Sequence, residues 1–280
     1  MLIYILWFLF FAFFVLNTLL LDIKYEYSHF KYQQQATVFL FEAIAIANHF
    51  IKDKLVYVPF KNLNQLRFNK NFTITYNKRK YKVTIEPETS KYPIRFPVAK
   101  TNELITLFTN LGFSEKEAVI LTNSILDFQD PDNLIRFNGA ESEYYKQFGY
   151  EPKNKPIDSL QELLWIKGFN EDIYNKIKPY ITIYAELVNI NFAEKPILKA
   201  LGFSDSEILI IEQYREQGKP ISIFFLKNML GPERWRSLNR RVELSLVPSI
   251  LRVVIEEETT NMKVILIIRS NGELIDVLWL

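Results

Sequence analysis

The stretch Asp127–Tyr145, DFQDPDNLIRFNGAESEYY, concentrates acidic side chains among aromatic ones. A single base, Arg136, lies in the segment, and carboxylates this close in sequence repel one another unless something positive lies between them. Pro131 and the Asn138-Gly139 pair interrupt regular structure between two acidic clusters, so we expect the chain to fold back and bring the later acids toward the earlier ones. The acids are Asp127, Asp130, Asp132, Glu141 and Glu143.

An all-oxygen set of this kind suits a hard cation. Calcium fits better than magnesium, because its coordination shell is larger and less strict. The spacing is not that of an EF-hand, since the twelve-residue D-x-D-x-D-G pattern is absent. The residues alone leave two interpretations open: a calcium site, or a solvated acidic loop with helix caps, because runs of carboxylates usually face water.

The composition excludes several kinds of chemistry. The chain has 280 residues, enough for one large or two small domains, and its net charge of +2 indicates neither a nucleic-acid binder nor an acidic tail. It has no cysteine, which excludes disulfides, thiolate metal sites and cysteine nucleophiles. The two histidines, His29 and His49, fall in the N-terminal helical segment. A Ser-His-Asp triad or a histidine-rich metal site in the globular part is therefore excluded, unless that segment folds back onto it.

The first 21 residues predict a membrane span. Met1 to Leu21 carries no charged residue, and as a helix it is about 31 Å long, enough to cross a bilayer once. The basic start and small-residue cleavage site of a secretory signal are both absent. The predicted span includes Leu2, Ile5, Trp7, Phe14 and Leu21.

The helix is predicted to continue beyond the span. No Pro or Gly occurs from Asp22 until Pro59, so one helix is expected to reach about Lys54. The part from Ala36 to Ile51 is too apolar for a solvated helix and should bury a wide stripe against a domain. Two interpretations of the first half stay open: an ordinary membrane anchor, or a pilin-type helix that lies partly in membrane or filament and partly on its own globular head.

A split antiparallel sheet is predicted next. Residues 72–76 and 81–85 alternate in polarity and are joined by residues 77–80 as a hairpin. Because two strands alone are not stable, they need partners from elsewhere. Candidates are 249–255 and the pair 263–269 and 273–279, the last two flanking an Asn-Gly hairpin signal. We therefore expect an α+β fold, with residues 98–241 inserted as a helical domain and the N-terminal helix across the sheet.

The insertion contains three similar helix-turn-helix units. Their turns are LGFS at 111–114, KGFN at 167–170 and LGFS at 201–204. In each unit the glycine is expected to supply a left-handed helix cap and the phenylalanine to enter the core. Such repetition argues for structure before activity. The basic residues that follow are interpreted as a solvated linker: Arg234, Arg236, Arg240 and Arg241.

Two other functions have less support in the sequence. The third unit resembles the helix-hairpin-helix of competence DNA-uptake proteins, but Gly202-Phe203-Ser204 lacks the second glycine of that motif. Asp205 and Glu207 also place negative charge where a phosphate would sit, which disfavours DNA binding. A glycosidase that uses two of the acids at 127–143 is the other alternative, and no histidine, cysteine or phosphate-binding loop supports an enzyme.

As a whole, the chain resembles the type II secretion system minor pseudopilin K family over nearly all of its length. The start, Leu2 to Trp7, looks like that of a mature chain of the family, and Ile5 stands where most pilins have glutamate, an absence typical of this family. The basic leader that ends in glycine is missing before Met1, and Phe128 replaces a tryptophan of the family pattern. The segments that carry the resemblance are 126–130 (LDFQD), 138–141 (NGAE), 144–145 (YY), 162–163 (EL), 167–169 (KGF), 178–182 (KPYIT) and 189–191 (NIN).

The resemblance implies a pilin-like long helix on a small antiparallel sheet, with a large inserted all-α domain of helix-hairpin-helix or SAM-like subdomains. It also implies that the five acids hold calcium. The expected role is a minor pseudopilin at the pseudopilus tip, without catalysis or nucleic acid, partnered by I- and J-type minor pseudopilins and the inner-membrane secretion platform. The expected location is the inner membrane, single-pass, with the globular part in the periplasm. The expected domains are 1–54, 55–97, 98–241 (subdivided into 98–183 and 184–241) and 242–280.

Overall fold

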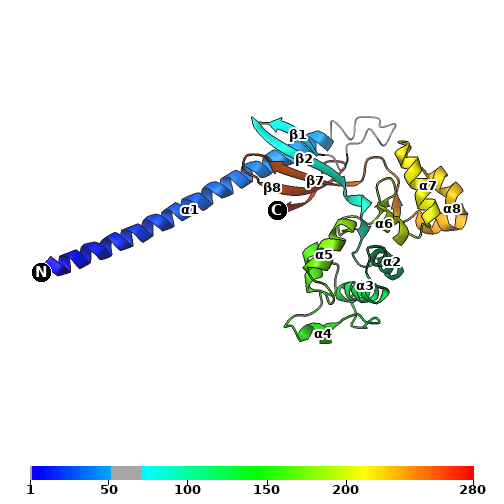
Figure 1. Ribbon diagram of the computed structural model, residues 1–280, viewed down its shortest axis with the longest axis horizontal. Coiled ribbons are helices and arrows are strands. Elements are labelled where there is room, and N and C mark those ends of the chain that lie inside the picture. Colours follow the sequence, from blue (N-terminus) through cyan, green and yellow to red (C-terminus); the bar gives the residue numbers. More distant parts are fainter. Residues whose placement is uncertain (1, 52–67, 69–70) are drawn as a thin grey trace.

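A single long helix leads into the rest of the molecule. The computed structural model describes residues 2–51, 68 and 71–280, without the side chains of residues 2–6, 8, 9 and 12. Helix α1 (Leu2–Phe50) is continuous and extends far from the sheet, which its C-terminal end meets (Figure 1). The predicted continuous helix is confirmed as far as Phe50, and its expected end at Lys54 lies outside the described residues.

The two halves of α1 have different surroundings. Near the sheet the apolar side chains on one side of the helix are buried, among them Phe39, Ala43 and Ile46, whereas Phe41 stays exposed. Farther out they are exposed: Phe14 is 58% and Phe30 57% exposed. Among the residues that the structure describes, no helix is both long and apolar enough to cross a membrane. The predicted span 1–21 lies partly outside that description.

The sheet has five antiparallel strands: β1 (Asn71–Tyr76), β2 (Arg79–Pro87), β7 (Ile250–Glu257), β8 (Lys263–Arg269) and β9 (Leu274–Trp279). They lie in the order β1-β2-β7-β8-β9, so strands from both ends of the chain pair at its centre. The predicted antiparallel sheet, with α1 packed on it, is thus confirmed. The first hairpin is tighter than expected: Asn77 and Lys78, at φ 46° and 66°, form a two-residue turn whose twist suits the strands.

A buried carboxylate joins α1 to this hairpin. Glu42, 8% exposed, accepts hydrogen bonds from Asn77 Nδ2 at 3.1 Å, Arg79 Nη1 at 3.3 Å and the Tyr81 hydroxyl. Because a buried carboxylate is stable only when its oxygens are satisfied, these donors fix the position of the helix over the sheet.

Residues between β2 and β7 form the helical part of the molecule, seen below and to the right of the sheet in Figure 1. Its α-helices are α2 (Thr101–Asn110), α3 (Glu115–Gln129), α4 (Ser142–Lys146), α5 (Glu171–Ile177), α6 (Lys195–Ala200), α7 (Asp205–Glu216) and α8 (Ile223–Leu238). Its 3-10 helices are η3 (Glu88–Ser90), η4 (Leu160–Trp165) and η5 (Lys178–Tyr180).

The predicted insertion, 98–241, is not all-α, because it contains the short strands β4 (Ile181–Thr182) and β5 (Val188–Asn189). These pair in parallel with β3 (Tyr92–Pro93) and β6 (Val242–Glu243), which lie just outside it. Two residues are too few to show a strand periodicity in the sequence. The domain boundaries, including the subdivision at 183, stay predictions.

The turns of the three repeated units are largely as predicted. Gly112, Gly168 and Gly202 have φ of +86°, +90° and +90°, the left-handed conformation that a cap of this kind needs. Phe203 is 3% exposed, whereas the phenylalanines of the first two turns are only partly buried against the core. In the second unit the segment before the turn is the six-residue 3-10 helix η4 rather than an α-helix.

The predicted arginine linker is wrong in part. Arg234 and Arg236 lie within α8, and Arg234 Nη1 is 2.6 Å from Glu207 Oε1 on α7. Arg241 pairs with Glu103 on α2. The segment expected to be a solvated linker is therefore partly helical, and two of its arginines form ion pairs with other helices.

An ion cluster lies where the sheet meets the helical part. Glu88 is fully buried, and Arg252 on β7 donates to it through Nε at 2.7 Å. Lys91 Nζ lies 3.1 Å from the same carboxylate, and the Thr182 hydroxyl donates to it at 2.7 Å. Because these groups come from β7, η3 and β4, the cluster ties the sheet to the segments inserted into it.

Candidate metal site

The site begins at the C-terminal end of α3. A capping box of Ser114 and Glu117 starts this helix, and it ends at Gln129, just before Pro131. Asp127 and Asp130 are three residues apart, so they lie on the same side of the last turn. Both side chains are buried, at 0% and 1% exposure. The end of the helix therefore places two carboxylates in the interior.

Arg136 lies between these two carboxylates. Its Nη1 is 2.6 Å from Asp127 Oδ1 and also contacts Asp130 Oδ2, while its backbone N–H donates to Asp127 Oδ2 at 3.2 Å. The sequence showed Arg136 only as the single base in an acidic stretch. Its position as the partner of both aspartates depends on how the loop returns, which the sequence pattern does not give.

The loop after Arg136 folds back closely over α3, as expected. A Cβ added to Gly139 would lie 1.9 Å from Asp127 Oδ2, so only glycine allows this approach. Asn123 Nδ2 donates to the Phe137 carbonyl at 2.7 Å, and Lys167 Nζ donates to the Gly139 carbonyl at 2.9 Å. These bonds hold the loop against the helix.

Glu141 is the third buried carboxylate. It is 2% exposed, and neither of its carboxylate oxygens has a hydrogen-bond partner among the residues that the structure describes. Burial, followed by the charges of Asp127 and Asp130, raises the pKa of Glu141 to about 7. Burial also raises the pKa of Asp127 against the opposing effect of Arg136. One guanidinium therefore does not balance the negative charge that three ionised carboxylates would bring.

The other two predicted ligands lie apart from the buried group. Asp132 is exposed and accepts a hydrogen bond from the Leu134 backbone N–H at 2.8 Å. Glu143 is exposed in the first turn of α4. The structure thus gathers Asp127, Asp130 and Glu141 in the interior and leaves Asp132 and Glu143 at the surface.

The side chains offer the oxygen donors that a hard cation needs, but they are not arranged around a common point as metal ligands. Among the described residues, no group of three or more histidine, cysteine, aspartate or glutamate side chains is placed to hold a metal ion. The donor chemistry nevertheless fits. Asp130 Oδ1 and both oxygens of Glu141 are buried without a hydrogen-bond partner, which is rare for polar atoms in the interior. Oxygen is the ligand that calcium prefers.

The sequence is similar to proteins that share one family description. A family model described as type II secretion system (T2SS), protein K matches residues 62–186. Type II secretion system protein K of Dickeya chrysanthemi is 25% identical over 173 residues, covering 60% of this chain and 43% of the relative. The protein of the same description from Pectobacterium carotovorum subsp. carotovorum is 30% identical over 147 residues, covering 48% of this chain and 45% of the relative. The chain thus spans less than half the length of these curated relatives.

A solved structure supports the fold. The match is to a chain in the crystal structure of the GspK-GspI-GspJ complex from the enterotoxigenic Escherichia coli type 2 secretion system. It has a TM-score of 0.70 at 19% identity and covers 89% of this chain and 96% of that chain. The two chains therefore share an overall fold over that length.

Proposed function

We propose that this chain is a member of the type II secretion system protein K family, whose model matches residues 62–186, and that it is a minor pseudopilin at the tip of the pseudopilus. In this role it assembles with I- and J-type minor pseudopilins and initiates or caps the filament that drives protein export across the outer membrane. Its function is assembly rather than catalysis.

The observation that carries the proposal is the exposed apolar part of α1. Trp7 is 69%, Phe14 58% and Phe41 69% exposed, on a helix whose other end is firmly packed on the sheet. A soluble monomer rarely leaves so much apolar surface uncovered. The helices of other pseudopilins and the interior of the membrane are also apolar, and they would bury this surface of α1. The name of the solved GspK-GspI-GspJ complex supports the choice of I- and J-type partners.

The same helix is the basis of the proposed location. The charge-free stretch from Met1 to Leu21 is long enough for a single inner-membrane span. The sheet and the helical part then lie in the periplasm, where they meet partner subunits, and the inner-membrane secretion platform is the remaining partner.

We further propose that calcium stabilises the loop between α3 and α4. Asp127, Asp130 and Glu141 would hold the ion, with Asp132 and Glu143 as the predicted outer members of the set. When bound, calcium supplies positive charge to a carboxylate group that Arg136 alone does not balance. The role is structural: the ion keeps the loop closed over α3. We also propose that the helical part consists of SAM-like subdomains.

The acidic group is a poor candidate for glycosidase chemistry. A glycosidase needs one carboxyl with a raised pKa and one that stays ionised. Here burial raises the pKa of both Asp127 and Glu141, and both side chains are almost fully buried.

DNA binding is likewise poorly supported. The first turn of α7 carries Asp205, paired with Lys195 at 3.3 Å, and Glu207, paired with Arg234 at 2.6 Å. Carboxylates at this helix N-terminus occupy the position that a phosphate would need.

A secretion assay in the host tests the proposal. In a strain that lacks this protein, the wild-type chain is expected to restore release of exported proteins. Phe41→Glu, which places a charge on the exposed apolar side of α1, is expected to restore much less. Gln34→Glu adds the same charge at an exposed polar position of the same helix and is the matched control. Normal secretion without the protein, or equal secretion with the two variants, would count against an assembly role.

A further inference from the structure

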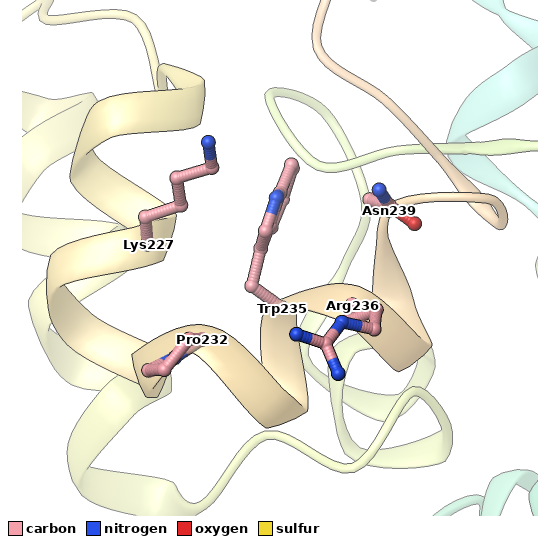
Figure 2. A pocket seen from close by; sticks show the side chains of 5 residues that line it. All are labelled: Lys227, Pro232, Trp235, Arg236 and Asn239. Carbon is pink, nitrogen blue, oxygen red and sulfur yellow. The ribbon is translucent and has the colours of Figure 1, made fainter.

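A groove lies at a break in helix α8, far from the acidic loop. Its volume is about 480 Å³, and its lining comes from both halves of the helix (Figure 2). The lining residues are Lys227, Pro232, Trp235, Arg236 and Asn239.

The sequence explains why the groove exists. Gly231 has φ 76° and ψ 168°, a conformation outside the helical range, and Pro232 has no backbone N–H to continue the helical hydrogen bonds. The two halves of α8 therefore run in different directions. Lys227 stands on the first half, and Trp235 and Arg236 stand on the second (Figure 2).

The groove is positively charged. Lys227 and Arg236 are both exposed, and neither has an ion pair or hydrogen bond to any described residue. Arg234, in contrast, is paired with Glu207 on α7. The described residues that line the groove include no carboxylate, so the charges of Lys227 and Arg236 are not balanced by the lining. A ligand that enters it gains by carrying negative charge.

The groove also has an apolar wall. Trp235 is partly buried against the core, and Figure 2 shows its indole standing up from the second half of the helix, on the side toward Lys227. Within the described structure no cation–π contact or ring pair covers this indole. Pro232 adds apolar surface at the base, and the Asn239 amide lies beyond the indole. An aromatic ring placed here would stack on a wall that is already held in place.

We propose that this groove binds an acidic aromatic segment of a partner protein, in which a carboxylate stands next to an aromatic ring. The ring stacks on Trp235, acidic side chains on either side of the ring pair with Lys227 and with Arg236, and the Asn239 amide supplies a further hydrogen bond. The occupant is a peptide rather than a free aromatic acid. With only five lining side chains, a small acid would make too few contacts to bind stably, whereas a peptide adds contacts through its main chain. This proposal does not depend on the calcium site.

The test uses the full chain, in detergent, and three capped peptides. The probe is Gly-Asp-Phe-Asp-Gly. One control peptide replaces both aspartates with asparagine, and the other replaces phenylalanine with alanine. Binding is followed through the indole N–H resonance of Trp235, assigned by its loss in Trp235→Phe. We expect a saturable shift with a Kd of about 1 mM for the probe, and a Kd at least about fivefold weaker for each control.

Substitutions test whether the peptide binds at the groove or to any basic surface of the protein. Lys227→Gln and Arg236→Gln are each expected to weaken probe binding about fivefold, as loss of one charge-assisted contact. Arg240→Gln removes an exposed neighbouring charge that does not line the groove and should leave the Kd unchanged. All three positions are exposed, so the thermal transition should not move.

Several outcomes would overturn the proposal. These are the absence of a saturable Trp235 shift, equal binding of the asparagine peptide, or equal weakening by Arg240→Gln and Arg236→Gln. Saturable binding of phenylacetate without binding of the peptide would show the same chemistry with a free acid as occupant, and would overturn the peptide.

Discussion

Arg136 Nη1 lies 2.6 Å from Asp127 Oδ1, beneath a loop that passes so close to this aspartate that Gly139 can carry no side chain. This ion pair holds the α3–α4 loop in the absence of an ion. Glu141, brought in by the same loop, has no comparable partner. The pair and the unpartnered carboxylate together determine how the loop should respond to substitution and to calcium.

Removing the guanidinium should destabilise the cation-free protein. Arg136→Gln leaves Asp127 and Asp130 buried without their cation, which is expected to lower the free energy of unfolding by about 3 kcal/mol. Calcium should recover most of this loss. Denaturant unfolding with chelator and with calcium measures both effects. Lys146→Gln, which breaks an exposed pair with Glu151, is the control and should change stability by less than about 0.5 kcal/mol. An Arg136→Gln protein as stable as wild type in chelator would contradict the role of the pair.

Glu141 and Glu143 should behave differently, although the sequence places both in the acidic cluster. Glu141→Gln removes a buried unpartnered charge, so in chelator it should be neutral or stabilising by about 1 kcal/mol. It should also abolish stabilisation by calcium. Glu143→Gln, at an exposed position, should keep most of that stabilisation. Melting curves with and without calcium decide the matter. Equal loss in the two variants would mean that Glu143 binds the ion as closely as Glu141.

The pair of Glu207 and Arg234 should make α7 and α8 sensitive to acid. The hydrogen bond from Arg234 lowers the pKa of Glu207 to about 2 from the ordinary 4.5. A lowered carboxyl pKa stabilises the fold above pH 4.5, and this stabilisation is lost as the pH falls from 4.5 to 2. Because Arg234 is half exposed, we expect a contribution of only about 1 kcal/mol.

Glu207→Gln should therefore flatten the fall in stability over this pH range. Denaturant midpoints measured at several pH values test it. Glu216→Gln, exposed on the same helix, is the matched control. If the stability of Glu207→Gln fell as steeply with falling pH as that of the wild type, the attribution of this acid sensitivity to the Glu207–Arg234 pair would be refuted.

The buried pair of Glu88 and Arg252 should show strong coupling. Arg252→Met leaves the Glu88 charge in the interior and is expected to lower the free energy of unfolding by about 3 kcal/mol or more. Glu88→Gln in the same chain should restore part of the loss, because it removes the buried charge that Arg252 no longer balances and that keeps only the pairing with Lys91. A double-mutant cycle measures the coupling. Additive effects of the two substitutions would show that the pair does not join the sheet to the helical part as described.

The sequence predicted the sheet well because its signals are local. Alternating residues and the Asn-Gly pair mark the strands and their hairpin, and a left-handed glycine such as Gly202 marks a helix end. The acidic loop was located for the same reason. The separation of Glu141 from Glu143 was not predictable, since it depends on which side of one turn faces α3. The role of Arg136 arises from a contact between segments, which no spacing records. The groove at Trp235 depends on the change of direction that Gly231 and Pro232 produce in α8.

The most direct test of the account is co-purification of the full chain with the I- and J-type minor pseudopilins of the same host. The three proteins are expressed together, extracted in mild detergent and separated by size exclusion after affinity capture of this chain alone. The account predicts that all three elute as one complex, that Phe41→Glu weakens it and that Gln34→Glu does not. Elution of the chain by itself, with both partners folded and present in the extract, would contradict the proposed role.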